Sequence, residues 1–190
     1  GRVEARIRVF ARLLLTASFL LAMLRPAHAD LIVPANAVVN LGSGVVDLAC
    51  TDVIVAGSLQ VASGSIVNAR HVTIQAGGTI DGGSGIVELG GNWTSAGQFI
   101  AGTSQVRFRD LCGLATATIA GNTTFANASF ATAIGKNYVF ATGTTQTVNN
   151  RLEIAGTAAL PIQFRSSTPS QVAFINLLLS GVQAIQHVGV

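Results

Sequence analysis

The motif Gly42-Ser43-Gly44-Val45-Val46-Asp47-Leu48 recurs along the chain. Its copies are Ala62-Ser63-Gly64-Ser65-Ile66-Val67, Gly83-Ser84-Gly85-Ile86-Val87-Glu88-Leu89 and, more loosely, Gly102-Thr103-Ser104-Gln105-Val106-Arg107-Phe108. They begin 20, 21 and 19 residues apart. Between them runs a second ladder of glycines with a period of 20 residues, Gly57, Gly77 and Gly97. A fixed period in this range indicates a stacked architecture, in which each repeat buries its apolar face against its neighbours.

Within each repeat, apolar residues alternate over short runs such as Val53-x-Val55, Val72-x-Ile74 and Val106-x-Phe108. Alternation with period 2 indicates half-buried strands, and the β-branched residues at these positions suit a pleated surface. A unit of this length is too short for a propeller blade, which needs about 40 residues. We therefore expect an all-β fold, a single-stranded parallel β-helix (β-solenoid) with coils of about 20 residues and glycines at its corners.

Residues 1–29 have the pattern of a secretory signal peptide. Four arginines precede an apolar run from Leu13 to Leu24, and Ala27-His28-Ala29 forms a small-x-small cleavage site before Asp30. A membrane anchor is the alternative, but the apolar run is shorter than the roughly 20 residues that a spanning helix needs. We expect an exported protein whose mature part begins at Asp30.

The net charge of +3 comes from this leader, which holds five of the 11 basic residues. From Asp30 onward the chain contains 6 basic and 7 acidic residues, so the mature part is close to neutral. No basic patch remains that would suggest nucleic acid as a partner. Residues 30–190 fit one elongated domain with no further membrane span. Because the sequence ends inside an apparent strand near Val190, we expect the solenoid to be truncated at its C-terminus.

The sequence also predicts the place of several individual segments in the coil. Leu31 to Leu41 should cap or open the first coil, and Asp110 to Gly113 should form a loop. The tripeptides Ile100-Ala101-Gly102, Ile119-Ala120-Gly121 and Ile154-Ala155-Gly156 resemble one another and are interpreted as related corners. Aromatic residues at strand positions should stack in the interior; these are Phe99, Phe108, Phe125, Phe130, Phe140, Phe164 and Phe174.

The segments GGNWTSAGQFIAGTSQVRF (90–108), ATIAGNTTFANASF (117–130), GTTQTV (143–148) and IQFRSSTP (162–169) resemble secreted bacterial β-helix repeat proteins. These are adhesin-like and autotransporter-passenger-like surface proteins of Gram-negative bacteria. The resemblance covers nearly all of residues 42–190 and implies a right-handed coil. It also implies a cell-surface or extracellular protein with a structural or adhesive role, whose partners would be host or cell-surface glycans or proteins.

Cys50 and Cys112 are the only cysteines, and an even count in an exported chain suggests a disulfide. They are 62 residues apart, or about three coils, which would separate equivalent positions by roughly 14 Å. A disulfide needs Cα atoms within about 7 Å. Bridging therefore requires the loop at Asp110 to fold back along the stack, and two buried thiols are the alternative.

A carbohydrate-active β-helix enzyme, a lyase or hydrolase with its catalytic coils outside this sequence, is the main alternative function. Such enzymes need paired acids or acid-bound calcium. Asp47 and Glu88 share a repeat column two coils apart with Asn68 near the intervening place, which is too wide for a catalytic pair. We predict no enzyme activity, no metal site and no cofactor. The lone histidines, His71 and His187, are interpreted as polar surface residues.

Trp93 is expected in the interior or at a corner rather than on a sugar-binding surface. Asn92, Asn122 and Asn127 match glycosylation acceptors, but in a chain rich in Asn and Thr such matches arise by chance. Asn122 and Asn127 are instead expected to form turn or ladder hydrogen bonds.

Overall fold

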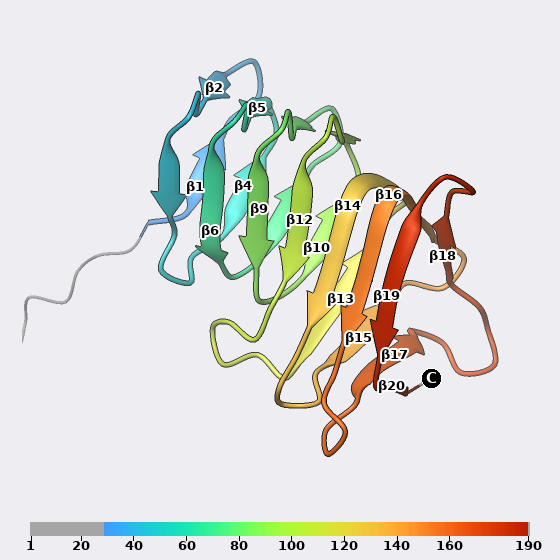
Figure 1. The fold of residues 1–190 in the computed structure, drawn as a ribbon. Coiled ribbons are helices and arrows are strands. Elements are labelled where there is room, and N and C mark those ends of the chain that lie inside the picture. The colour runs from blue at the N-terminus through green and yellow to red at the C-terminus, as the bar shows by residue number, and fades with distance from the viewer. Residues whose placement is uncertain (1–28, 190) are drawn as a thin grey trace, which may run out of the picture.

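The computed structural model describes residues 29–189, and all of their regular structure is β-strand. The chain winds through about seven turns, with coils of about 22 residues. Figure 1 shows the strands stacked in order from the N-terminus to the C-terminus, so that each coil lies beside the next. The predicted parallel β-solenoid is confirmed. Its right-handed sense stays a prediction.

The strands form three parallel sheets, here called A, B and C. Sheet A contains β1 (Leu31–Val33), β4 (Val53–Val55), β7 (Val72–Ile74), β10 (Trp93–Ser95), β13 (Thr116–Ala120), β15 (Asn137–Phe140), β17 (Ile162–Ser166) and β20 (Val188–Gly189). Sheet B contains β2 (Val38–Asn40), β5 (Ser58–Gln60), β8 (Thr79–Asp81) and β11 (Gln98–Ile100). Sheet C contains β3 (Val45–Asp47), β6 (Ser65–Ala69), β9 (Ile86–Leu89), β12 (Gln105–Phe108), β14 (Thr123–Ala131), β16 (Thr145–Ala155), β18 (Phe174–Leu177) and β19 (Val182–Gln186).

The recurring sequence motif forms the corner between sheets B and C. Its first residues, Gly42, Ala62, Gly83 and Gly102, all have a left-handed backbone, with φ between 53° and 58°. Glycine adopts this conformation without the steric cost that a side chain adds. The motif therefore repeats because each coil turns the same way at the same place.

The second ladder marks the corner between sheets A and B, and one of its three members differs from the sequence prediction, since Gly78 stands in the place expected for Gly77. Because Ser58 pairs with Thr79 and Thr79 with Gln98, the preceding residues Gly57, Gly78 and Gly97 are equivalent. A Cβ atom at Gly57 would collide with the carbonyl oxygens of the previous coil. These glycines are needed for the close approach of stacked backbones.

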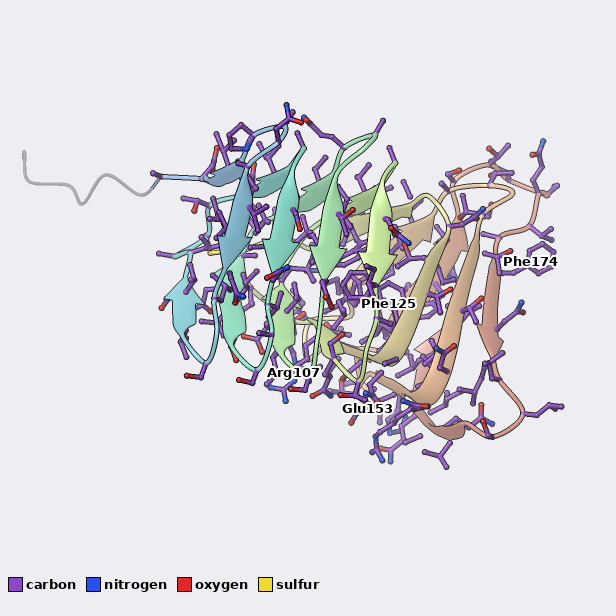
Figure 2. All side chains as sticks on the ribbon, turned by 90° about the horizontal axis from the view of Figure 1, so that it is seen from above. Arg107, Phe125, Glu153 and Phe174 are labelled. Carbon is purple, nitrogen blue, oxygen red and sulfur yellow. A yellow bond between two sulfur atoms is a disulfide. The ribbon has the colours of Figure 1, made fainter. Side chains whose placement is uncertain are left out.

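The interior is filled by the inward side chains of all three sheets. Trp93 is fully buried and its ring packs against Phe99, Phe108 and Phe125. The prediction of interior aromatic residues holds except at Phe174, which is 49% exposed. Phe174 pairs with Thr145 in an outward column, and Figure 2 shows it at the outer edge while Phe125 lies between the sheets.

Two other expectations are settled by the strand order. The three Ile-Ala-Gly tripeptides are not related corners, because their isoleucines lie on β11 of sheet B, β13 of sheet A and β16 of sheet C. An apolar strand end followed by small residues suits any of the three corners. The similarity therefore does not show which corner each tripeptide belongs to. Leu31 to Leu41 opens the first coil as β1 and β2.

The predicted signal peptide falls almost wholly on residues 1–28, which lie outside the described residues. Within residues 29–189 no helix is long and apolar enough to cross a membrane.

Candidate functional site

Charged side chains are few on this protein, and several of them gather on the outer face of sheet C. Glu88, Arg107, Ser129 and Glu153 occupy one register position on β9, β12, β14 and β16. Neighbouring strands of a sheet are about 4.8 Å apart, so these side chains form a continuous polar column along the stack. Figure 2 shows Arg107 and Glu153 pointing outward on the same side of the molecule.

Hydrogen bonds tie this sheet C column together. The Ser129 hydroxyl donates to Glu153 Oε2 at 3.0 Å and accepts from Arg109 Nη1 at 2.9 Å. Arg107 donates from Nε and Nη2 to the side-chain oxygen of Gln105, at 2.9 and 2.7 Å. The guanidinium groups are therefore held in place on the surface, and each keeps further donors for a polar ligand.

A shallow hollow of about 540 Å³ adjoins the column at the corner between sheets C and A. Its lining includes Glu88, Arg109 and Asp110 on one side and Thr132 on the other. The Asp110 carboxylate accepts a hydrogen bond from the Ala133 amide at 2.6 Å, which fixes one wall. The other lining residues are apolar or glycine, so the hollow combines a few charged groups with apolar surface: Leu111, Ala131, Ala133, Ala155 and Gly156. The Thr132 hydroxyl already accepts the amides of Ile134 and Lys136.

The two carboxylates of the sheet C column are farther apart than the paired acids of glycosidases. Glu88 and Glu153 are separated by three strand spacings, roughly 14 Å, whereas the two acids of glycosidases lie about 5 to 9.5 Å apart. Asp47 lies next to the bulge residue Asn68, whose amide donates to Asp47 Oδ1 at 3.0 Å. Among residues 29–189, no three His, Cys, Asp or Glu residues are grouped as metal ligands.

Cys50 and Cys112 form a disulfide, with Cα atoms 5.4 Å apart. The bridge forms because the loop between β12 and β13 folds back along the stack. Leu111 lies against Gly90, one coil back, and Cys112 Sγ lies 3.9 Å from the carbonyl oxygen of Ala69, two coils back. This is the route that the sequence required for a bridge across three coils.

Lys136 lies beneath this loop and was not singled out by the sequence. Its side chain is fully buried, and Nζ donates to the carbonyl oxygens of Gly90 and Arg109. Burial lowers the pKa of Lys136. Since these carbonyls are left over at a solenoid corner, the ammonium group satisfies backbone acceptors that no strand reaches. Its role is to hold the corner together.

A second polar group lies on the same corner nearer the N-terminus. Arg70 forms an ion pair with Asp52 at 2.8 Å, and its hydrogen bond holds the pKa of Asp52 below its usual range. His71 is half-buried rather than a plain surface residue, and its Nδ1 accepts the Asn92 backbone amide at 2.8 Å. Burial lowers the pKa of His71.

The candidate acceptor asparagines make backbone contacts. Asn92 and Asn122 accept the amides of Thr118 and Thr145 with their side-chain oxygens. Asn127 donates to the carbonyl oxygens of Thr103 and Ser104. Trp93 is interior, as expected, and its Nε1 donates to the Thr123 hydroxyl at 3.0 Å. His187 lies near the C-terminal end of the described residues, where its carbonyl oxygen accepts the Ile162 amide at 3.0 Å.

Sequence reasoning placed Glu88 in a repeat column but did not place Glu153 there. It also missed Arg107, Arg109 and Ser129. One signal was present, since Glu88 and Arg107 hold the same place in two copies of the motif. Ser129 could not be found this way, because the motif no longer recurs recognisably after Phe108.

No known protein family matches this chain. A search of the curated proteins and a search of the solved structures likewise find no significant relative.

Proposed function

We propose that this chain is an exported protein with a structural or adhesive role at the cell surface of a Gram-negative bacterium. The rigid coil would present its outer faces to glycans or proteins of another surface. The observation that carries the proposal is the sheet C column with its adjoining hollow. The column presents Glu88, Arg107 and Glu153 on a backbone that is fixed by parallel pairing, with strands about 4.8 Å apart. Ser129 is buried and serves to link Arg109 to Glu153.

Two further features support this role. The disulfide between Cys50 and Cys112 suits an oxidising compartment, as does the leader-like sequence of residues 1–29. The outer faces of sheets A and B are rich in small hydroxyl and amide side chains, such as Thr73, Thr94 and Gln60. Surfaces of this kind make many weak contacts and few strong ones.

The alternative of a carbohydrate-active enzyme is less well supported, because the column separates Glu88 from Glu153 by an arginine and a serine. One experiment distinguishes the adhesive role from the enzyme. The purified chain is incubated with immobilised neutral and acidic polysaccharides and with whole cells, and both bound protein and released sugar are measured.

For the adhesive role we expect binding without released sugar. The double variant Arg107→Ala with Glu153→Ala should bind about tenfold more weakly, since two surface contacts of about 0.7 kcal/mol each are lost. The matched control, Thr73→Ala with Thr94→Ala on sheet A, should bind as the native chain does. Sugar release would contradict the proposal, and so would equal loss of binding in both variants.

A further inference from the structure

The loops at the corner between sheets C and A lengthen in three successive coils. This corner consists of residues 70–71 after β6 and of residues 90–92 after β9. The corners after β12, β14 and β16 are longer: residues 109–115, 132–136 and 156–161. Figure 1 shows these three loops reaching beyond the sheets on the same side of the molecule. The turn itself does not require the added length, because the earlier coils make it with fewer residues.

Two of these loops expose a large apolar side chain to solvent. Ile134 is 50% exposed and Leu160 is 48% exposed. The two loops are in contact, since a Cβ atom at Gly135 would lie 3.4 Å from the Cβ atom of Leu160. The next coil already reaches this corner, where the carbonyl oxygen of His187 accepts the Ile162 amide. The exposed apolar surface therefore belongs to the corner itself, and a surface of this kind marks a contact site.

The hollow of about 540 Å³ lies among the same three loops, because each of them contributes to its lining through Leu111, Ala133 and Gly156. Ala131 and Ala155 add further apolar surface. An aliphatic side chain that enters the hollow removes apolar area from water, which stabilises the contact. A sugar in the same place buries hydroxyl groups against apolar walls, which costs free energy. The lining therefore favours a protein side chain over a glycan.

Two carboxylates with unused oxygen atoms border the hollow. Glu88 has no hydrogen bond or ion pair within residues 29–189, and Arg107 beside it on β12 donates to a side chain of its own strand instead. Asp110 accepts one backbone amide, with Oδ2 alone. The third charged group of the lining, Arg109, already donates through Nη1 to the sheet C column. The free carboxylate oxygens are complementary to a cationic side chain.

We propose that this corner binds a protein partner through a segment that carries apolar and basic side chains next to each other. An apolar side chain of the segment enters the hollow and covers Ile134 and Leu160. A lysine or arginine of the segment pairs with Glu88 and Asp110. The same carboxylates disfavour an anionic lipid surface, which attracts basic residues. This inference rests on the proposed adhesive role and narrows its partners to proteins.

The test measures the binding of fluorescent peptides to the purified chain by anisotropy. The probe peptide repeats the unit Ser-Leu-Lys, and two comparison peptides carry Glu in place of Lys or Ser in place of Leu. One corner variant, Ile134→Ser with Leu160→Ser, removes the exposed apolar side chains. The other, Glu88→Gln with Asp110→Asn, removes both negative charges and keeps an oxygen that accepts the loop amide.

The matched control is Ile100→Ser with Asp81→Asn. Ile100 is 43% exposed and pairs with Asp81 on sheet B, so the control also removes an exposed apolar side chain and an acid, but at another site. Far-UV circular dichroism checks that each variant is folded. The peptide comparisons need only the native chain, so the test stands even if a variant fails to fold.

The native chain and the control should bind the Ser-Leu-Lys peptide equally well, and each corner variant should bind it about tenfold more weakly. The native chain should also bind each comparison peptide about tenfold more weakly than the probe. A native chain that does not bind the probe would overturn the inference, as would corner variants that bind it like the native chain. Tighter binding to phosphatidylglycerol vesicles than to the peptide would overturn it in favour of a membrane surface.

Failure of this inference can be told apart from failure of the adhesive role. If both corner variants bind whole cells as the native chain does, while Arg107→Ala with Glu153→Ala weakens that binding, the adhesive role stands and the corner site is overturned. If the native chain binds neither cells nor polysaccharides nor the probe peptide, both proposals are overturned.

Discussion

The two halves of the solenoid turn their corners in different ways. From Leu31 to Phe108 each coil has three short strands of three to five residues, separated at the corner between sheets B and C by a left-handed residue. From Thr116 onward the strands lengthen, and β14 and β16 have 9 and 11 residues. These long strands run through the place where the first half has a glycine corner, as Figure 1 shows for β14 and β16.

The difference teaches how the core is filled. In β14 and β16 the corner is replaced by a register shift after Phe125, a bulge that bends a continuous strand. The interior then changes from Val, Ile and Leu to rings, with Phe108 and Phe130 stacked at a centroid distance of 4.4 Å. The rings begin with Trp93, Phe99 and Phe108 in the last coil of the first half and continue through the second half.

The largest expected effect comes from the aromatic half. Phe130 is buried and touches Phe108, Tyr138 and Phe164, so Phe130→Ala should lower the free energy of unfolding by about 4 kcal/mol. Val72→Ala in the aliphatic half should cost about 2 kcal/mol. Urea denaturation of both variants checks this, and equal losses would show that the two cores do not differ.

The disulfide ties the first coil to the boundary between the halves. Replacing both Cys50 and Cys112 by serine should lower the free energy of unfolding by about 3 kcal/mol, because the unfolded chain loses a constraint across 62 residues. Thermal denaturation with and without a reducing agent measures the effect. The native chain in reductant should match the variant in either condition, and a native chain indifferent to reductant would contradict the account.

Corner glycines of the two halves differ in the space around them, and single substitutions test this difference. Gly57→Ala should lower the free energy of unfolding by about 2 kcal/mol, since its Cβ would press on the backbone of Pro34 and Ala37. Gly143 in the second half has a φ of 74° but open space around it, so Gly143→Ala should cost only about 1 kcal/mol. Differential scanning calorimetry of the pair gives the order, and the reverse order would contradict the close-approach argument.

The smallest expected effect is a pH dependence in the first half. The folded state binds fewer protons at His71 than the unfolded chain, because burial lowers its pKa and its Nδ1 already accepts the Asn92 amide. Stability should therefore fall as the pH drops from 7 through the unfolded pKa of about 6.5. His71→Ala should remove this slope and His187→Gln should keep it. Urea midpoints between pH 7 and 5 measure the slope, and an unchanged slope in His71→Ala would remove His71 as its source.

The first half could be predicted from sequence because its corners use the same residue types at a fixed period. The ladder at Gly42 marks a left-handed backbone, and the ladder at Gly57 marks a close approach of stacked backbones. Both requirements select glycine or another small residue, so they can be recognised in a single sequence. In the second half the sequence does not show where each coil begins, because a bulged strand needs no glycine at a fixed position. Ile154 was therefore assigned to a related corner, although it lies inside the 11 residues of β16.

The candidate site was harder to predict than the fold. The column from Glu88 to Glu153 crosses both halves, so its members share no common spacing in the sequence. Lys136 is a similar case, since its partners at Gly90 and Arg109 come together only when the loop folds back. Phe174 was placed inside by its residue type, but its register with Thr145 turns it outward.

The in-register stacking of the two halves is tested most directly by distances between paired spin labels on one outward column. Labels at Ser65 and Asn127 are three coils apart, those at Ser65 and Arg151 four, and those at Val45 and Arg151 five. The account predicts distances that increase by about 4.8 Å per coil, to roughly 14, 19 and 24 Å between backbone positions. Distances that fail to increase in this order would contradict a single continuous parallel solenoid.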